Sequence, residues 1–202
     1  MKDFSKETLF GQIMKARTRI YQVAEATPLE VYPMPGGWDM LLKREDLSPI
    51  HSYKWRGAYN FMKVREKEAK AMGVTAASAG NHAQGVALSA ARLGVSAHVF
   101  MPKAAPRLKV EATARLGGSW VEIHQVGDNF DQASAAATDF CRESGALYVP
   151  PYDDMLVMAG QGAMGEEMMV GSNRPAVVLP QIGGGGRLAG VATARQHYDP
   201  DG

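Results

Sequence analysis

Apolar residues near the start of the chain recur at the spacing of one helix face. The pattern predicts an amphipathic helix up to about Glu25, with Asp3 or Ser5 as its cap. Thr27-Pro28 ends this helix, because proline cannot continue it and biases the preceding residue toward extended structure. The apolar stripe comprises Leu9, Ile13, Ala16, Ile20 and Val23.

Further along, short apolar runs alternate with stretches of helical periodicity. Strands that are separated by helices of ten or more residues need crossover connections. The alternation therefore predicts an α/β fold with mostly parallel sheets and helices on both faces. The expected strands cover residues 39–44, 73–77, 97–101, 120–124, 146–149 and 176–179. One expected helix opens near Lys54, and five more cover residues 81–93, 107–116, 129–144, 156–169 and 188–196.

Composition excludes several classes of function. The 22 Lys and Arg residues balance 21 Asp and Glu residues, so no basic excess indicates a nucleic-acid partner. The single cysteine, Cys141, excludes an internal disulfide and a cysteine-based metal cluster, and we expect no metal site. No apolar run approaches ~18 residues and no signal-peptide pattern opens the chain. We therefore expect a cytoplasmic protein without a membrane partner.

Lys54 is the first candidate for chemistry. It opens a run with apolar residues at Trp55, Ala58, Tyr59 and Met62, which predicts a buried helix face with Lys54 in the first turn. The partial positive charge of the helix N-terminus and the nearby Arg56 both favour the neutral amine. The neutral amine can attack an aldehyde, and we expect Lys54 to form a Schiff base with a carbonyl cofactor.

The second candidate is a small turn between a strand and a helix, Ser78-Ala79-Gly80-Asn81. Free backbone N–H groups and polar side chains at the positive end of a helix suit a carboxylate. The competing interpretation is that Asn81 is only a helix N-cap. We expect His82 to be a hydrogen-bonded scaffold residue, since no second metal ligand stands four residues later.

The third candidate is the run Gly183-Gly184-Gly185-Gly186, which also lies between a predicted strand and a predicted helix. Four glycines let the backbone wrap closely around a phosphate at a helix N-terminus. A plain flexible turn is the alternative. No Gly-Lys-Ser/Thr follows, which disfavours a nucleoside-triphosphate loop. The pattern Gly184-x-Gly186-x-x-Ala189 also fits dinucleotide binding, but it is weak alone.

An aldehyde-reactive amine, a carboxylate-binding turn and a phosphate-binding loop together match one cofactor, pyridoxal 5'-phosphate. At this point a family resemblance is visible. The chain from about Thr27 to Gly190 closely resembles the threonine deaminases (threonine ammonia-lyases), which are fold-type II pyridoxal-phosphate enzymes. The segments that carry it, in order, are 43–46 (KRED), 52–58 (SYKWRGA), 78–85 (SAGNHAQG), 159–162 (AGQG) and 183–186 (GGGG).

The resemblance implies β-elimination of L-threonine to 2-oxobutanoate and ammonia, in isoleucine biosynthesis, with Lys54 removing the α-proton. It implies that Lys54 carries the cofactor as a Schiff base and that Asn81 hydrogen-bonds the ring oxygen of the cofactor. It assigns the substrate carboxylate to Ser78, Ala79, Gly80 and Asn81, and the phosphate to Gly183, Gly184, Gly185 and Gly186. Related serine racemases carry a second catalytic serine at the place of Ala79, which favours elimination here.

The resemblance also implies two three-layer α/β/α domains. Residues 1–50 and 150–202 form a large cofactor-binding domain, and residues 51–149 form a small inserted one. Family members continue beyond the position of Gly202, so we expect an incomplete large domain with exposed apolar surface and self-association. We also expect a homo-oligomer.

Two local departures from the family pattern stand beside the glycine run. Arg187 replaces the usual leucine and either reaches the phosphate or disturbs the packing of the loop, and Gln181-Ile182 lengthens the link before the loop. Two alternatives to threonine dehydration stay open. One is an L-serine dehydratase or racemase of the same fold, and the other is an inactive cofactor-binding fragment.

Overall fold

The computed structural model describes residues 6–172 and 177–200. Internal contacts divide the chain into two compact units. Unit 1 comprises Met1–Tyr53 and Tyr152–Gly202, and unit 2 comprises Lys54–Pro151. The domain boundaries that the resemblance implies, near residues 50 and 150, lie close to these positions.

A four-stranded parallel sheet forms the centre of unit 2, with the strand order β5-β4-β3-β6. Strand β3 is buried along its whole length, as expected for a parallel strand with both faces covered. The predicted α/β fold with a parallel sheet is therefore confirmed. The strands are β3 (Val74–Ala77), β4 (Ala97–Met101), β5 (Val121–Gln125) and β6 (Leu147–Tyr148).

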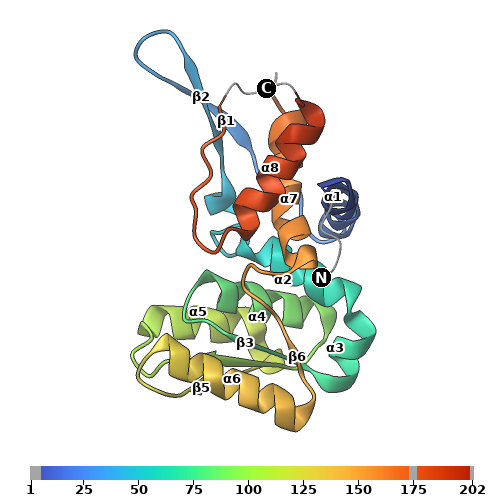
Figure 1. Ribbon diagram of the computed structural model, residues 1–202. Helices are drawn as coiled ribbons and strands as arrows, with labels where there is room; N and C mark the ends of the chain where they lie inside the picture. Colours follow the sequence, from blue (N-terminus) through green and yellow to red (C-terminus); the bar gives the residue numbers. More distant parts are fainter. Residues whose placement is uncertain (1–5, 173–176, 201–202) are drawn as a thin grey trace. The chain divides into compact units, whose positions relative to one another are not determined.

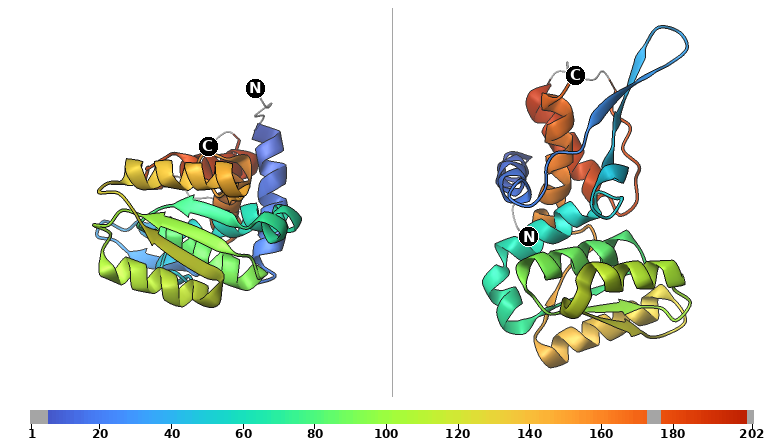
Figure 2. Two further views of the ribbon diagram at one scale, coloured as in Figure 1. Left: turned by 90° about the horizontal axis from the view of Figure 1, so that it is seen from below. Right: turned by 180° about the vertical axis from the view of Figure 1, so that it is seen from behind.

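Helices cover both faces of this sheet (Figure 1). Helix α6 packs on β3 and β4 from one side, and α4 and α5 lie on the other side, as Figure 2 also shows. Helix α2 packs against α4. The helices of unit 2 are α2 (Lys54–Val64), α3 (Glu66–Met72), α4 (Asn81–Leu93), α5 (Arg107–Gly117) and α6 (Phe130–Ser144), with the short η2 (Gly118–Trp120) after α5.

Unit 1 is built around α7, a helix that is buried around most of its circumference. Helices α1 and α8 both pack along it. Strands β1 and β2 form an antiparallel hairpin in which Leu29 pairs with Lys43. The elements are α1 (Lys6–Ile20), β1 (Leu29–Pro33), β2 (Asp39–Lys43), η1 (Glu45–Leu47), α7 (Met155–Val170) and α8 (Gly186–Tyr198).

Glycines bring the backbones of α7 and α8 into contact. A Cβ atom on Gly165 would lie 2.8 Å from Cα of Val191, and one on Gly190 would lie 2.6 Å from the carbonyl oxygen of Met158. The same added Cβ atom on Gly190 would also lie 2.7 Å from the Cα atom of Gly162. At these positions no layer of side chains separates the two helices. The second turn of α8 is consequently held against α7 by its own backbone.

The strand predicted over residues 176–179 is wrong for residues 177–179, which have no regular structure, while residue 176 lies outside the described residues. A strand requires a hydrogen-bonded neighbour. Within the described residues of unit 1, the only sheet is the hairpin β1-β2, and residues 177–179 do not pair with it. The parallel sheet expected for this part of the chain is thus not formed there. Val177, Leu179 and Ile182 are exposed, Leu179 to 85%.

The first helix is shorter than predicted. Helix α1 ends at Ile20 rather than near Glu25, because the chain tightens into a turn in which the N–H of Val23 bonds to the carbonyl of Ile20 at 3.0 Å. The predicted caps, Asp3 and Ser5, lie outside the described residues.

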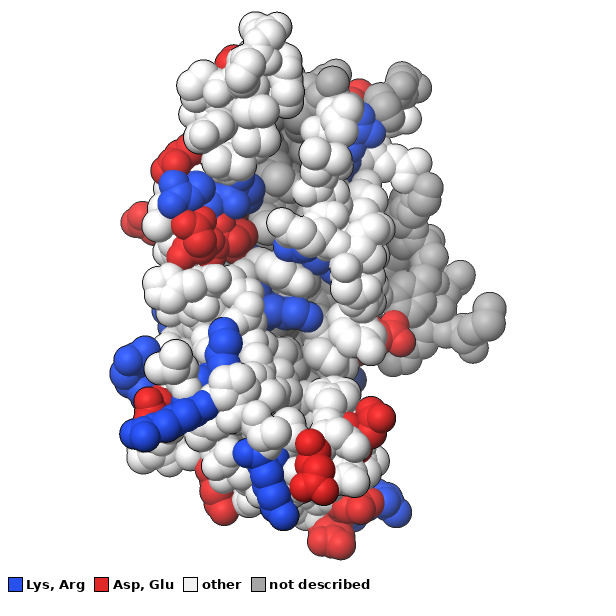
Figure 3. Space-filling model, turned by 90° about the vertical axis from the view of Figure 1, so that its left-hand side faces the viewer, with Lys and Arg blue, Asp and Glu red and all other residues white. Residues whose placement is uncertain are grey.

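Charged side chains of both signs are mixed on the face drawn in Figure 3. This distribution agrees with the balanced composition of the chain. Within residues 6–172 and 177–200, no helix combines the length and the apolar character that crossing a bilayer requires.

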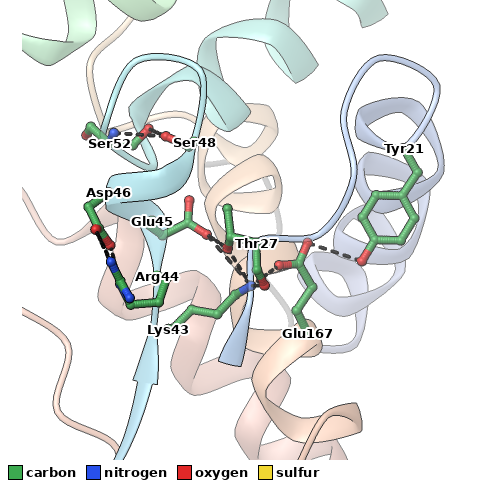
Figure 4. A network of polar contacts seen from close by, with 9 residues as sticks. All are labelled: Tyr21, Thr27, Lys43, Arg44, Glu45, Asp46, Ser48, Ser52 and Glu167. Atoms are coloured by element: carbon green, nitrogen blue, oxygen red, sulfur yellow. Dashed lines mark hydrogen bonds and ion pairs between the residues drawn. The ribbon is translucent and has the colours of Figure 1, made fainter. Parts of the chain in front are cut away.

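The side chain of Lys43 is the centre of a buried polar network in unit 1 (Figure 4). Its ammonium lies 2.6 Å from Oε2 of Glu167, and it also donates to the hydroxyl and the carbonyl oxygen of Thr27. The Thr27 hydroxyl donates to Glu45 at 2.6 Å, and the Tyr21 hydroxyl donates to Oε1 of Glu167 at 3.1 Å. All three protons of the ammonium therefore have acceptors, which is the condition under which buried charges are tolerated.

We predict that Lys43→Met lowers the free energy of unfolding by about 3–5 kcal/mol, because it leaves the Glu167 carboxylate buried without its cation. Only 6% of the Lys43 side chain and 4% of the Glu167 side chain are exposed. Urea unfolding followed by circular dichroism measures the loss. The matched control is Arg44→Met, which removes the neighbouring cation from its solvent-exposed pairs with Glu30 and Asp46. The control should cost far less, and equal losses for the two variants would contradict the role given to Lys43.

Candidate active site

The carboxyl ends of β3 and β6 meet at the point where the strand order of unit 2 reverses. From β3 the chain moves to β4 and β5 on one side, and it then returns to place β6 on the other side of β3. In open α/β sheets, ligands bind outside the carboxyl ends of the strands at such a reversal. The turn at residues 78–80 follows β3 here, and residues 149–151 follow β6.

Lys54 is the first residue of α2, as predicted, and its side chain is half-buried. The amine donates a hydrogen bond of 2.7 Å to the carbonyl oxygen of Pro151. Nε2 of His82 lies 2.9 Å from the carbonyl oxygen of Val149. Two carbonyls of one short segment after β6 therefore fix the Lys54 amine and the imidazole beside it.

The backbone of α2 is placed by a close approach to α4. A Cβ atom on Gly85 would lie 3.0 Å from Cα of Trp55 and 3.2 Å from the carbonyl carbon of Lys54. Any side chain at Gly85 would push the first turn of α2 away. Arg56, the cation predicted to disfavour a charged Lys54, is fully buried in the same turn.

The turn after β3 has the geometry of a helix start. Gly80 is the N-cap residue of α4, and Asn81 is the first helical residue, so the interpretation of Asn81 as a simple N-cap is wrong. The Ser78 hydroxyl accepts a hydrogen bond of 3.1 Å from the Gly80 N–H. Asn81 is exposed, and its Oδ1 accepts from Nζ of Lys109 at 3.3 Å. A Cβ on Gly80 would meet nothing within 4 Å, so the turn is open on that side.

His82 has the buried, hydrogen-bonded position expected of a scaffold residue. Burial lowers its pKa to about 4, against an opposing effect of the Val149 hydrogen bond, and the nearby Lys54 lowers the pKa further. Since a carbonyl oxygen only accepts, Nε2 carries the proton of the neutral ring. Nδ1 is buried and finds no hydrogen-bond partner among the described residues.

The glycine run lies in unit 1, where it leads directly into α8. Gly184 and Gly186 pack against Tyr152, and a Cβ on Gly186 would lie 2.5 Å from the Tyr152 carbonyl oxygen. Gly185 is the N-cap of α8 with φ +84°, a conformation that favours glycine. Cβ atoms on Gly183 and Gly185 would meet nothing within 4 Å. The run is therefore a shaped loop with an open side at a helix N-terminus, which fits a phosphate.

Arg187 follows the glycine run as the second residue of α8. Its guanidinium lies 4.3 Å from the centroid of the Tyr53 ring, and its Nη2 donates to the carbonyl oxygen of Gln181. The side chain thus ties the residues before the glycine run to those after it. Sequence reasoning did not identify Tyr152, Val149 or Pro151 as parts of the site, because aromatic packing and backbone carbonyls leave no local signature.

The structure brings part of the predicted set together. Lys54 and the residue 78–81 turn belong to unit 2, on neighbouring segments at the carboxyl edge of one sheet, while the glycine run belongs to unit 1. The donors present in each unit fit a pyridoxal phosphate: a partly buried amine for its aldehyde and an open glycine loop for its phosphate. The individual roles of these residues stay predictions.

A family model described as "Pyridoxal-phosphate dependent enzyme" matches residues 20–201. The chain therefore belongs to the family of pyridoxal-phosphate-dependent enzymes. This membership confirms the predicted resemblance to fold-type II enzymes.

Individual relatives are consistent with this membership. The chain is 42% identical to the biosynthetic L-threonine dehydratase IlvA of Haemophilus influenzae over 98% of its own length and 38% of that protein. It is 49% identical to the L-threonine ammonia-lyase of Geobacter sulfurreducens over 81% of its length and 40% of that protein. The chain thus spans less than half the length of these two relatives.

Two solved structures have the same fold. The processed form of threonine deaminase isoform 2 from Solanum lycopersicum superposes with a TM-score of 0.89 at 37% identity, covering 98% of this chain and 55% of that one. Maize serine racemase superposes with a TM-score of 0.86 at 28% identity, covering 95% of this chain and 58% of that one.

We predict that the burial of His82 makes stability depend on pH. The folded chain keeps this imidazole neutral down to about pH 4, whereas the unfolded chain protonates it near pH 6.5. The unfolded chain therefore binds more protons between these values, and the free energy of unfolding falls by up to about 3 kcal/mol as pH drops from 6.5 to 4. Urea unfolding at several pH values should show a weaker dependence for His82→Gln. An unchanged dependence would contradict the prediction.

The glycine run makes a second prediction. Gly186→Ala should destabilise the chain by about 1–3 kcal/mol, because its Cβ would overlap the Tyr152 carbonyl. Gly183→Ala should leave the unfolding midpoint nearly unchanged and should weaken pyridoxal phosphate binding at least tenfold, measured by titration of tryptophan fluorescence. Gly11→Ala, the same change in open space on α1, is the control. Wild-type cofactor affinity in Gly183→Ala would contradict the phosphate assignment.

Proposed function

We propose that this chain carries the pyridoxal-phosphate site of an L-threonine dehydratase, which converts L-threonine to 2-oxobutanoate and ammonia in isoleucine biosynthesis. The observation that carries the proposal is the anchoring of the Lys54 amine on the Pro151 carbonyl, at the carboxyl edge of the sheet beside the residue 78–81 turn. The threonine-deaminating relatives support the choice of substrate.

Lys54 has two tasks in this proposal. Its Nζ would hold the cofactor through the aldehyde group, and its free amine would take the α-proton of the bound amino acid. The cofactor supplies an electron sink for the resulting negative charge. Both tasks need the unprotonated amine, which the N-terminus of α2 and the buried Arg56 favour.

The remaining roles are orientation and anion binding. The turn formed by Ser78, Ala79, Gly80 and Asn81 binds the substrate carboxylate at the start of α4, and the Asn81 amide hydrogen-bonds the ring oxygen of the cofactor. The run from Gly183 to Gly186 binds the phosphate at the start of α8. Open space beside Gly80, Gly183 and Gly185 supports these assignments.

Ala79 favours elimination over racemisation. Its methyl group has no exchangeable proton, so the turn provides no hydroxyl at that position to deliver a proton to the opposite face of the α-carbon. Loss of the β-hydroxyl is then the productive outcome after Lys54 removes the α-proton. L-Serine dehydration remains the nearest alternative, since one methyl group in a pocket is worth only about 1–3 kcal/mol.

The cellular context is part of the proposal. The proposal includes a cytoplasmic location, which is compatible with the biosynthetic role named for two bacterial relatives. Homo-oligomerisation is supported by the exposed apolar residues Val177, Leu179 and Ile182, whose burial would be favourable. The balance of 22 Lys and Arg residues against 21 Asp and Glu residues supports a small amino acid rather than a nucleic acid as the partner.

The decisive experiment combines labelling and turnover. After incubation with pyridoxal phosphate and borohydride reduction, peptide mass mapping should locate the adduct on Lys54, and the purified chain should produce 2-oxobutanoate from L-threonine. Lys54→Ala should abolish the adduct and lower turnover at least about 100-fold. The exposed Lys103→Ala is the control and should change neither.

The outcomes separate the alternatives. An adduct with faster turnover of L-serine would replace threonine by serine as the substrate, and racemised serine would indicate a racemase. An adduct without any turnover would reduce this chain to a cofactor-binding fragment. An unmodified Lys54 would overturn the proposal altogether.

A further inference from the structure

Three side chains with metal-ligating atoms converge on the sheet of unit 2, away from Lys54. The parallel register of β4 and β5 pairs His98 with Glu122 and Phe100 with His124. Residues two apart in a strand share a face, so His98, Glu122 and His124 project from the same face of the sheet. Phe140 of α6 packs against this face. The cluster joins β4 to β5, which is an edge strand.

The distances suit a single cation. Nδ1 of His98 lies 3.0 Å from Nε2 of His124, and each of these nitrogens lies 3.6 Å from an oxygen of Glu122. In a tetrahedral zinc site with bonds of about 2.0–2.1 Å, two ligand atoms lie about 3.3 Å apart. The observed distances between ligand atoms, 3.0 and 3.6 Å, lie on either side of this value, so metal binding requires only small side-chain adjustments.

Aromatic packing holds both rings in the ligating orientation. The His98 ring lies 4.4 Å from the Phe140 ring, and the His124 ring stacks on Phe100 at 4.5 Å with an interplanar angle of 15°. The two imidazoles are half-buried, while the Glu122 side chain is 65% exposed. The cluster is therefore preorganised on one side and open to water on the other.

A divalent cation would bind the lone pairs of all three side chains, whereas a proton shared between the two imidazoles leaves the Glu122 carboxylate without a short hydrogen bond from them. With both rings neutral, one N–H joins the two facing nitrogens, and the Glu122 carboxylate, 3.6 Å from each, receives no short hydrogen bond from them. A divalent cation at the centre would accept a lone pair from all three groups at once. Two imidazoles and one carboxylate are a borderline donor set that suits Zn²⁺ and its neighbours rather than Mg²⁺ or Ca²⁺.

We propose that His98, Glu122 and His124 form a binding site for a Zn²⁺-type divalent transition-metal ion, with water as the fourth ligand. The ion links the edge strand β5 to β4 and stabilises unit 2. The expectation of no metal site came from the single cysteine, which bears only on thiolate sites. This inference is independent of the proposed function and of pyridoxal phosphate.

The test is a titration of the metal-free full chain with Co²⁺, a spectroscopic substitute for Zn²⁺, followed by competition with Zn²⁺. We expect one Co²⁺ per chain with the visible absorption bands of a tetrahedral site, their loss on Zn²⁺ addition, and a higher unfolding temperature with Zn²⁺. His98→Asn and His124→Asn should each weaken binding at least about tenfold. Glu122→Gln should weaken it as well.

Matched controls keep the test decisive. His51→Asn removes an exposed imidazole at a residue with φ +54°, where asparagine is tolerated, and should leave Co²⁺ binding intact. Glu143→Gln, on the exposed surface of α6, is the control for Glu122→Gln. If the histidine variants fail to fold by circular dichroism, the exposed Glu122 variant decides. No Co²⁺ binding by the folded wild type, or equal binding by the variants at His98, His124 and Glu122, would overturn the proposal.

Discussion

The arrangement of the candidate active site depends on the contact between α4 and the first turn of α2. Because Gly85 has no side chain, the two backbones approach within van der Waals distance at Trp55 and Lys54. This contact fixes where the Lys54 side chain begins, and the Pro151 carbonyl fixes where it ends. The same helix, α4, starts at the turn that is expected to bind the carboxylate, so one element places both groups.

The sequence predicted those helices and strands whose ends are marked by nearby glycine or proline residues. The bounds of α4 and β4 match the prediction to the residue, because Gly94 adopts the left-handed conformation that ends α4 and Pro102 follows β4. The strand predicted over residues 176–179 had equally suitable residues. Its pairing depends on a neighbouring strand far away in the sequence, however, and local pattern carries no information about whether that neighbour is in place.

The site was predictable to the same degree and for the same reason. Lys54 in a first helical turn and a turn directly before α4 follow from local spacing. Local spacing does not show which of the four glycines are packed and which are open. That difference comes from Tyr152, a residue distant in sequence whose ring and carbonyl occupy the space beside two of them. Carbonyl anchors such as that of Pro151 are equally invisible, since every residue has one. The resemblance supplied the roles, and the structure supplied the physical reasons for particular residues.

The backbone contact between α7 and α8 affects how unit 1 assembles. Glycine in a helix interior costs roughly 0.5–1 kcal/mol relative to alanine, and α7 contains Gly160, Gly162 and Gly165. An isolated α7 would therefore be a poor helix, whereas its glycine positions lose no side-chain rotamers when the helix docks. Helix formation and docking should then occur in a single cooperative step. The helix that follows the glycine run consequently acquires its position only once α7 has formed.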